Sequence, residues 1–442
     1  MMIYHEGKDG KPYYNFQYFD QLIDFLLSAG LRPILELSMA PTLMATGQGT
    51  VFWWKANITP PKDYRLWTDL ASETIIHSIN RYGLDEVRQW YFEIWNEPCI
   101  IDGFWSGTPE QFYELYRDAY FAVKRVDGGL RVGAPAHGND TGQQYEFYQG
   151  LLDYCEQNGC IPDFITPHPY PNDWPLDNGK VVMTYDGPDR TYHDMNWIKA
   201  TRDVSPYSKA EIHCTEWNAS PSPRDLVHDT AFMAPFIIQN NLRCMGLADS
   251  LCFWTFTDIF EELGAGDTPF HGGFGLINVH GLKKSAYYGY LFLNKLGDTV
   301  IAQGDDYIVC RNADGIQILM WNYVHYKESF ARGDRSLISV TDRYNVFLPA
   351  GDKHFYVSLD GVEGEYRMTE YILDRDNGSV YDHWVRQGGQ NNLTEEEVEY
   401  LDRMSGPATR FSVREFSGRF AGEYGVSPHG VTMVTLKKVF RP

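Results

Sequence analysis

Two glutamates stand directly after apolar, strand-like runs, a position from which carboxyl groups can do chemistry. Glu97 closes the run in YFEIWNEP, and Glu216 closes the run in AEIHCTEWN. Barrel enzymes place their active sites at the carboxyl ends of parallel strands. Cleavage of a glycosidic bond with retention needs a protonated carboxyl group and, about 5 Å away, an ionised one. A single acidic residue at a strand end is common, but this pair can converge on one such site.

Residues next to the two glutamates suit a sugar pocket. Asn96 precedes Glu97 and can donate a hydrogen bond to a sugar hydroxyl. Trp217 and Trp254 stand at or inside strand ends, where they either shape the pocket floor or belong to the core. His168 follows a further strand in ITPHPY, and a polar contact to substrate competes there with a plain loop histidine.

The elements that must position these residues alternate along the chain from about residue 14 to 298. Helical patterns separate short apolar runs. A capping box opens one helix, with Thr108 as the cap, Pro109 in the first turn and Gln111 closing the box. This alternation predicts an α/β fold with a parallel sheet and helices outside it. The predicted strands begin at Pro33, Trp90, Leu130, Asp163, Ala210 and Leu251.

The character of the sequence changes after Leu296. Alternating β-rich runs such as Gln317–Trp321 and Val431–Leu436 are separated by turn residues. This pattern is typical of antiparallel sheets and predicts a β-sandwich. We therefore expect a barrel catalytic domain over residues 1–298 and a sandwich accessory domain over residues 299–442.

Composition excludes several classes of function. The 442-residue chain carries a formal net charge of −21, which argues against nucleic acid and against an anionic membrane surface as partners. Its seven cysteines form no CxxC pair, which predicts reduced thiols and a cytoplasmic location. The N-terminus lacks the apolar core of a signal peptide, and no apolar run is long enough to span a bilayer. His213, His228 and His271 are not arranged as metal ligands, so we expect no metal and no cofactor.

Four segments together resemble a known family. FEIWNEP, TEWNASPSPRDLVHDTAF, FWTFTDIFEE and FHGGFGL are similar to the signature segments of glycoside hydrolase family 39, and more to its bacterial β-xylosidase branch than to its α-L-iduronidase branch. The likeness runs in order from about Tyr13 to the C-terminus. It implies a (β/α)8-type barrel followed by a β-sandwich, with Glu97 as general acid/base and Glu216 as nucleophile. It also implies seven sugar-contacting residues: Asn96, His168, Trp254, Glu261, Glu262, Phe52 and Phe104.

The chain departs from the family's pattern in its strand count. The barrel class places the acid/base after the fourth strand and the nucleophile after the seventh, whereas Glu97 follows the second predicted strand and Glu216 the fifth. We therefore expect a barrel that lacks its first two β/α units. An open wall of six strands exposes edges and apolar surface, and this predicts a homo-oligomer that covers them. Cys99 after NEP, and HPYP around His168, are further departures that bear on the preference for the leaving group.

The expected function is a retaining glycoside hydrolase that releases terminal β-linked xylose from xylo-oligosaccharides by double displacement. One alternative is the same machinery acting on an arabinoside, a glucoside or a uronide. Another is an inactive, carbohydrate-binding derivative, which the incomplete barrel favours and the two retained glutamates oppose.

Overall fold

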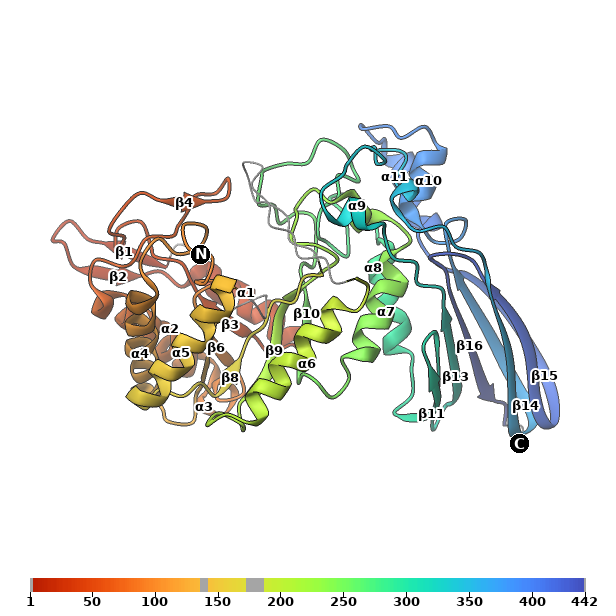
Figure 1. The fold of residues 1–442 in the computed structure, drawn as a ribbon, viewed down its shortest axis with the longest axis horizontal. Coiled ribbons are helices and arrows are strands. Elements are labelled where there is room, and N and C mark those ends of the chain that lie inside the picture. The colour runs from red at the N-terminus through yellow and green to blue at the C-terminus, as the bar shows by residue number, and fades with distance from the viewer. Residues whose placement is uncertain (1–2, 136–141, 172–186, 441–442) are drawn as a thin grey trace. The chain divides into compact units, whose positions relative to one another are not determined.

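Six short strands form one sheet in the order β10–β9–β8–β7–β6–β3, and neighbouring strands from β3 to β9 run parallel. The computed structural model describes residues 3–135, 142–171 and 187–440 (Figure 1). Each predicted strand start lies within one residue of an observed one. The strands are β3 (Ile34–Leu37), β6 (Tyr91–Ile94), β7 (Arg131–Gly133), β8 (Phe164–Ile165), β9 (Glu211–Trp217) and β10 (Ser250–Phe253).

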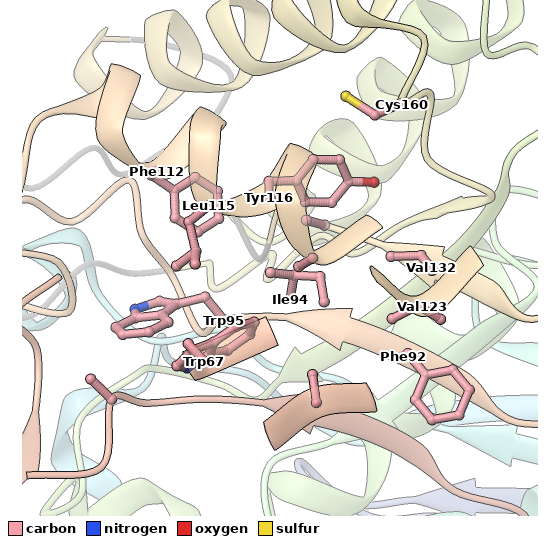
Figure 2. Packing of buried hydrophobic residues seen from close by; sticks show 14 of the residues in the cluster. Trp67, Phe92, Ile94, Trp95, Phe112, Leu115, Tyr116, Val123, Val132 and Cys160 are labelled. Carbon is pink, nitrogen blue, oxygen red and sulfur yellow. The ribbon is translucent and has the colours of Figure 1, made fainter. Parts of the chain in front are cut away.

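The helices between these strands bury apolar faces against the sheet. The helices are α1 (Gln17–Ser28), α2 (Tyr64–Tyr82), α3 (Leu84–Val87), α4 (Pro109–Val126), α5 (Gly142–Asn158) and α6 (Arg190–Asp203). The capping box at Thr108 is present and starts α4 as predicted. Phe112 and Leu115 of α4 pack in the same buried cluster as Phe92 and Ile94 of β6 (Figure 2). Two small hairpins, β1 (Tyr4–Glu6) with β2 (Pro12–Tyr14) and β4 (Thr50–Val51) with β5 (Ala56–Asn57), complete this part.

Alternation along each strand turns every second side chain to the inner face of the sheet. Phe92 and Ile94 face the helices, so Tyr91 and Glu93 face inward. The register places Glu36 of β3 opposite Glu93. The sheet is a curled half-barrel, with β3 and β10 as its end strands among the described residues. The observed fold is thus α/β with an open, curled parallel sheet, and no closed eight-stranded barrel is formed by the described part of the chain.

The second half of the chain forms a six-stranded sheet in the order β11–β12–β13–β16–β14–β15, with the printed pairs antiparallel. The strands are β11 (Thr299–Gly304), β12 (Tyr307–Asn312), β13 (Gly315–Trp321), β14 (Lys353–Leu373), β15 (Ala408–Val426) and β16 (Val431–Lys438). The helices are α7 (Met233–Arg243), α8 (Ser285–Asn294), α9 (Glu328–Ala331), α10 (Val380–Arg386) and α11 (Glu395–Met404). Short 3₁₀ helices cover Leu226–Asp229 and Tyr344–Val346.

One connected sheet encloses a core here, where the sequence predicted the two sheets of a sandwich. β14 pairs with β16 only from Tyr366 to Leu373, and its earlier residues pair with β15 alone. Val362 and Phe420 of this β14–β15 hairpin share a buried cluster with Met320 of β13. The hairpin therefore helps to cover one face of its own sheet, and the described residues show an antiparallel-sheet domain rather than two stacked sheets.

The compact units do not divide at residue 298. One comprises Met1–Pro169, His193–Glu216 and Gly246–Cys252, and the other Tyr170–Tyr192, Trp217–Met245 and Phe253–Pro442. The reason lies in α7 and α8. Ile238 of α7 and Phe292 of α8 pack in one cluster with Leu319 of β13, so both helices cover the antiparallel sheet.

Candidate active site

The backbone that carries Glu97 is held in an uncommon conformation. Trp95 has a φ of 69° and Glu97 a φ of 42°, in the left-handed region that side-chain-bearing residues rarely adopt. Such backbone costs on the order of 1–3 kcal/mol and persists only where its surroundings fix it. The Trp95 indole is fully buried, lies edge-on to Trp105 and donates its N–H to the Phe104 carbonyl at 2.9 Å. Figure 2 shows Trp95 above Trp67 in this core.

Three predicted site residues come together at the strand ends. His168 Nδ1 lies 2.9 Å from Glu97 Oε1 and 3.5 Å from Glu216 Oε2. The His168 side chain is fully buried, whereas the side chains of Glu97 and Glu216 retain 14% and 9% exposure. One imidazole edge therefore faces both carboxyl groups, and both carboxyl groups stay accessible to a small ligand.

The separation of the carboxyl groups distinguishes the two ways of hydrolysing a glycoside. The closest ligand atoms of Glu97, His168 and Glu216 all lie within 4.8 Å of one another. Retaining enzymes hold their carboxyl groups about 5–5.5 Å apart, whereas inverting enzymes need roughly 6.5–9.5 Å to seat a water. The observed spacing fits direct attack by one carboxylate.

The same three side chains are close enough to hold a cation. A histidine with two carboxylates is a donor set that zinc accepts. The direct hydrogen bond between His168 and Glu97 accounts for the cluster without an ion, and we assign no metal to it. The absence of a metal requirement stays a prediction.

Polar contacts continue behind His168 into the half-barrel. His168 Nε2 lies 2.9 Å from the Thr215 hydroxyl, which donates to Glu93 Oε1 at 3.2 Å. Burial raises the pKa of Glu93 well above its ordinary value, and Glu36 adds to this rise, whereas the hydrogen bond from Thr215 opposes it. Glu93 is only 1% exposed, so a neutral carboxyl group is the form that this environment favours.

Three further predicted residues belong to the same unit as Glu97. Asn96 is buried, and its Oδ1 has no hydrogen-bond partner among the described residues, which leaves this oxygen for a ligand hydroxyl. Phe104 is buried and its ring centroid lies 5.6 Å from that of Phe52. Two turn hydrogen bonds, Ile100 N–H to Glu97 and Phe104 N–H to Ile100, connect this aromatic pair to the glutamate.

The remaining predicted residues, Trp254, Glu261 and Glu262, lie in the second unit. Trp254 is half-buried and packs edge-on against Phe260 at 5.1 Å. Glu261 is engaged by basic neighbours, since Arg224 lies 2.7 Å from its Oε2 and His271 lies 2.5 Å from its Oε1. Glu262 is buried. The structure therefore shows two separate groups of predicted residues, one in each unit.

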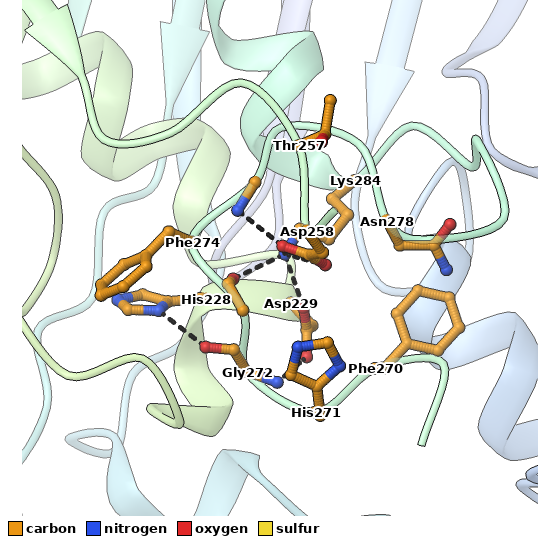
Figure 3. Close-up of polar contacts among 12 residues, drawn as sticks. His228, Asp229, Thr257, Asp258, Phe270, His271, Gly272, Phe274, Asn278 and Lys284 are labelled. Carbon is orange, nitrogen blue, oxygen red and sulfur yellow. Dashed lines mark hydrogen bonds and ion pairs between the residues drawn. The ribbon is translucent and has the colours of Figure 1, made fainter. Parts of the chain in front are cut away.

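A buried charge cluster anchors the loop that bears Glu261 and Glu262 (Figure 3). Lys284 Nζ contacts Asp229 at 2.8 Å and Asp258 at 3.1 Å, and donates to the Gly273 carbonyl at 2.8 Å. Arg343 binds the second oxygen of Asp229 at 2.7 Å. Burial opposes the charge on Lys284, but the two aspartates outweigh it and raise the pKa of Lys284.

Sequence reasoning missed Glu93, Thr215 and Lys284. A signal for Glu93 was present, because this acidic residue interrupts the buried strand residues Phe92 and Ile94. Thr215 directly precedes Glu216, but no local pattern distinguishes it from an ordinary strand threonine.

Known proteins are similar to this chain over nearly its whole length and over most of their own. The sequence profile described as Glycosyl hydrolases family 39 matches residues 1–420. A β-xylosidase of Caldicellulosiruptor saccharolyticus is 35% identical over 99% of this chain and 86% of its own length. The crystal structure of a family 39 enzyme from Xanthomonas axonopodis pv. citri is 29% identical, with a TM-score of 0.86 over 99% of this chain and 85% of that one. A structure described as a monomeric β-xylosidase from Caulobacter crescentus CB15 is 29% identical, with a TM-score of 0.85 over 98% and 87%.

These likenesses and the curled α/β sheet define the class of the protein, which is a glycosidase acting on carbohydrate. The chain belongs to glycoside hydrolase family 39. Among the residues that the structure describes, no helix has the length and apolar character needed to cross a membrane.

Proposed function

We propose that this glycosidase releases terminal β-linked xylose from short xylo-oligosaccharides with retention of configuration. The observation that carries the proposal is the placement of Glu97 and Glu216 on one edge of His168, within the spacing of a retaining pair. The β-xylosidases to which the chain is similar support xylose as the sugar.

In the proposed mechanism Glu216 attacks the anomeric carbon while Glu97 protonates the departing oxygen, which gives a glycosyl-enzyme ester. Glu97 then takes a proton from water, and the resulting hydroxide displaces Glu216 from the sugar. Asn96 offers its buried Oδ1 to a sugar hydroxyl. The resemblance to the family supports a further role in sugar contact for Trp254, Glu261, Glu262, Phe52 and Phe104.

The proposal extends to the domains and to assembly. Residues 1–298 are assigned to a barrel-type catalytic domain and residues 299–442 to a sandwich-type accessory domain.

Copies of the chain associate through the side of the half-barrel that carries β3 and α1. Tyr18, Leu22 and Phe25 of α1 support this, because they are 64%, 43% and 63% exposed and lie three to four residues apart on one helix face.

The test is hydrolysis of a panel of aryl glycosides by the 442-residue chain. We expect turnover of the β-xyloside, loss of at least about 10⁴-fold in Glu216→Ala, and a loss in Glu97→Ala that is large only for poor leaving groups. Equal losses in Glu97→Ala for good and poor leaving groups contradict the acid role of Glu97.

Two controls separate the rival functions. Faster turnover of an arabinoside, glucoside or uronide reassigns the sugar and keeps the chemistry. Sugar binding by calorimetry without turnover selects the carbohydrate-binding alternative. Each assay is repeated with a chelator, and a loss of activity there contradicts the metal-free mechanism.

A further inference from the structure

A chain of hydrogen bonds leads from Glu97 to a buried carboxyl group that the proposed mechanism does not use. It runs from Glu97 through His168 and Thr215 to Glu93, with heavy-atom distances of 2.9, 2.9 and 3.2 Å. Three different strands or strand ends contribute to it, since Glu93 lies on β6, Thr215 on β9 and His168 after β8. All four residues belong to one compact unit.

The hydrogen bond in which the Thr215 hydroxyl donates to Glu93 Oε1 sets the direction of this series of hydrogen bonds. A threonine hydroxyl has one proton, and Thr215 donates it to Glu93. The Thr215 oxygen can then only accept from His168, so Nε2 of the ring carries the hydrogen. A neutral imidazole has one N–H, which leaves Nδ1 as an acceptor. The partner of Nδ1 at 2.9 Å is Glu97, which must supply the proton of that hydrogen bond.

We propose that Glu93 and Thr215 are positioning residues that select the Nε2–H tautomer of His168 and thereby hold the proton on Glu97. This inference rests on the proposed function, because a protonated Glu97 is the acid of the first step. Glu93 acts through Thr215 and His168 and does not touch the substrate.

The charges around Glu97 and His168 show why such selection is needed. Glu216 lies 3.5 Å from Nδ1, and the carboxyl groups of Glu36 and Glu93 and the thiol of Cys99 also interact with this pair electrostatically. Two carboxyl oxygens at Nδ1 favour a hydrogen on that nitrogen, and an Nδ1–H would stabilise ionised Glu97 instead. Glu93 opposes a hydrogen on Nδ1 because its Oε1 accepts the hydrogen bond from Thr215, and a neutral carboxyl group still has this acceptor oxygen. The raised pKa of Glu93 means that it does so without adding negative charge.

The experiment compares Thr215→Val with Thr215→Ser, because valine keeps the shape of threonine and serine keeps its hydroxyl. In protein with ¹⁵N-labelled histidine, His168→Gln identifies the ring signals of His168. We expect Nε2–H in the wild type and in Thr215→Ser, and Nδ1–H in Thr215→Val. This measurement does not depend on turnover.

Kinetics give the second readout. On a substrate with a poor leaving group, the basic limb of kcat/KM in Thr215→Val should move down by about one pH unit, which is the effect of one net hydrogen bond. Turnover of a dinitrophenyl glycoside, which needs no acid, should stay within about threefold of wild type. Glu93→Leu, which removes the acceptor, should match Thr215→Val, and Glu93→Gln should lie closer to the wild type.

The outcomes separate this inference from the proposed function. If the wild type hydrolyses glycosides but Thr215→Val leaves the tautomer and the basic limb unchanged, the inference is overturned. Equal losses in Thr215→Val and Thr215→Ser on both substrates indicate a structural role only and also overturn it. If the wild type hydrolyses no glycoside, the proposed function fails, while the ring signals still decide the tautomer.

Discussion

Replacing Lys284 by methionine should destabilise the second unit strongly. The side chains of Lys284, Asp229 and Asp258 have no solvent exposure, and the ammonium group is the cation nearest to Asp258 in the cluster described here. Methionine fills a similar volume but leaves Asp258 without its ion pair, while Asp229 keeps Arg343 at 2.7 Å. Removing one partner of a buried pair costs about 3–5 kcal/mol, because the remaining charge is desolvated without compensation.

The assay is urea unfolding followed by tryptophan fluorescence and by circular dichroism. With a urea slope of about 3 kcal/mol/M, the expected loss lowers the midpoint by roughly 1–1.7 M. Lys283→Met is the matched control, since Lys283 is half-buried and lies 5.7 Å from the Tyr287 ring, a cation–π contact worth about 1 kcal/mol or less. Equal midpoints for the two variants refute the reasoning.

The pH dependence of the variant provides an independent check. In the wild type, burial raises the pKa of Asp258, while Lys284 opposes that rise. Without Lys284 the folded protein binds a proton at Asp258 more tightly than the unfolded chain does. Stability from such a group is present at low pH and lost as pH rises. The deficit of Lys284→Met should therefore be smaller at pH 5 than at pH 8, and Asp258→Asn in the same chain should recover part of it.

Two further predictions concern acid sensitivity and assembly. Burial lowers the pKa of His325 and of His429 to about 3, so the unfolded chain takes up protons before the folded one as pH falls below about 6.5. Each histidine should lower the free energy of unfolding by about 1.4 kcal/mol for each pH unit in that range. Asparagine tolerates the φ of 64° at position 429, so His429→Asn should remove one of the two contributions to this pH dependence. Urea midpoints with the same pH dependence in the wild type and in His429→Asn contradict this. Light scattering should show an oligomer for the wild type and a monomer for Phe25→Lys. A monomeric wild type contradicts the proposed association through α1.

Local sequence patterns were sufficient to predict the strands of the parallel sheet, the start of α4 and the residues at the centre of the candidate active site. The strand starts follow from short apolar runs, and the start of α4 follows from the Thr108 capping box, because both signals act over a few residues. Glu97 and His168 follow strands of one parallel sheet and Glu216 stands near the carboxyl end of another, and this topology brings strand ends together.

Features that depend on distant partners were not predictable in the same way. Lys284 is fully buried only because Asp229 and Asp258 surround it, and its own sequence neighbours do not reveal them. No local pattern shows that α7 and α8 pack on the antiparallel sheet. The two sheets of the predicted sandwich were not confirmed for a related reason, since no local pattern shows that the β14–β15 hairpin covers a face of its own sheet.

The strand order of the antiparallel sheet has a consequence for synthesis of the chain. β13 pairs on one side with β12, which precedes it, and on the other side with β16, from which residues 322–430 separate it. At about 5–20 residues per second, a ribosome needs roughly 5–20 s to deliver that second partner. During this interval the apolar strand IQILMW within β13 presents an unpaired edge in the nascent chain. The nascent chain is therefore open to chaperone capture, and to mispairing with another nascent copy, between the emergence of β13 and that of β16.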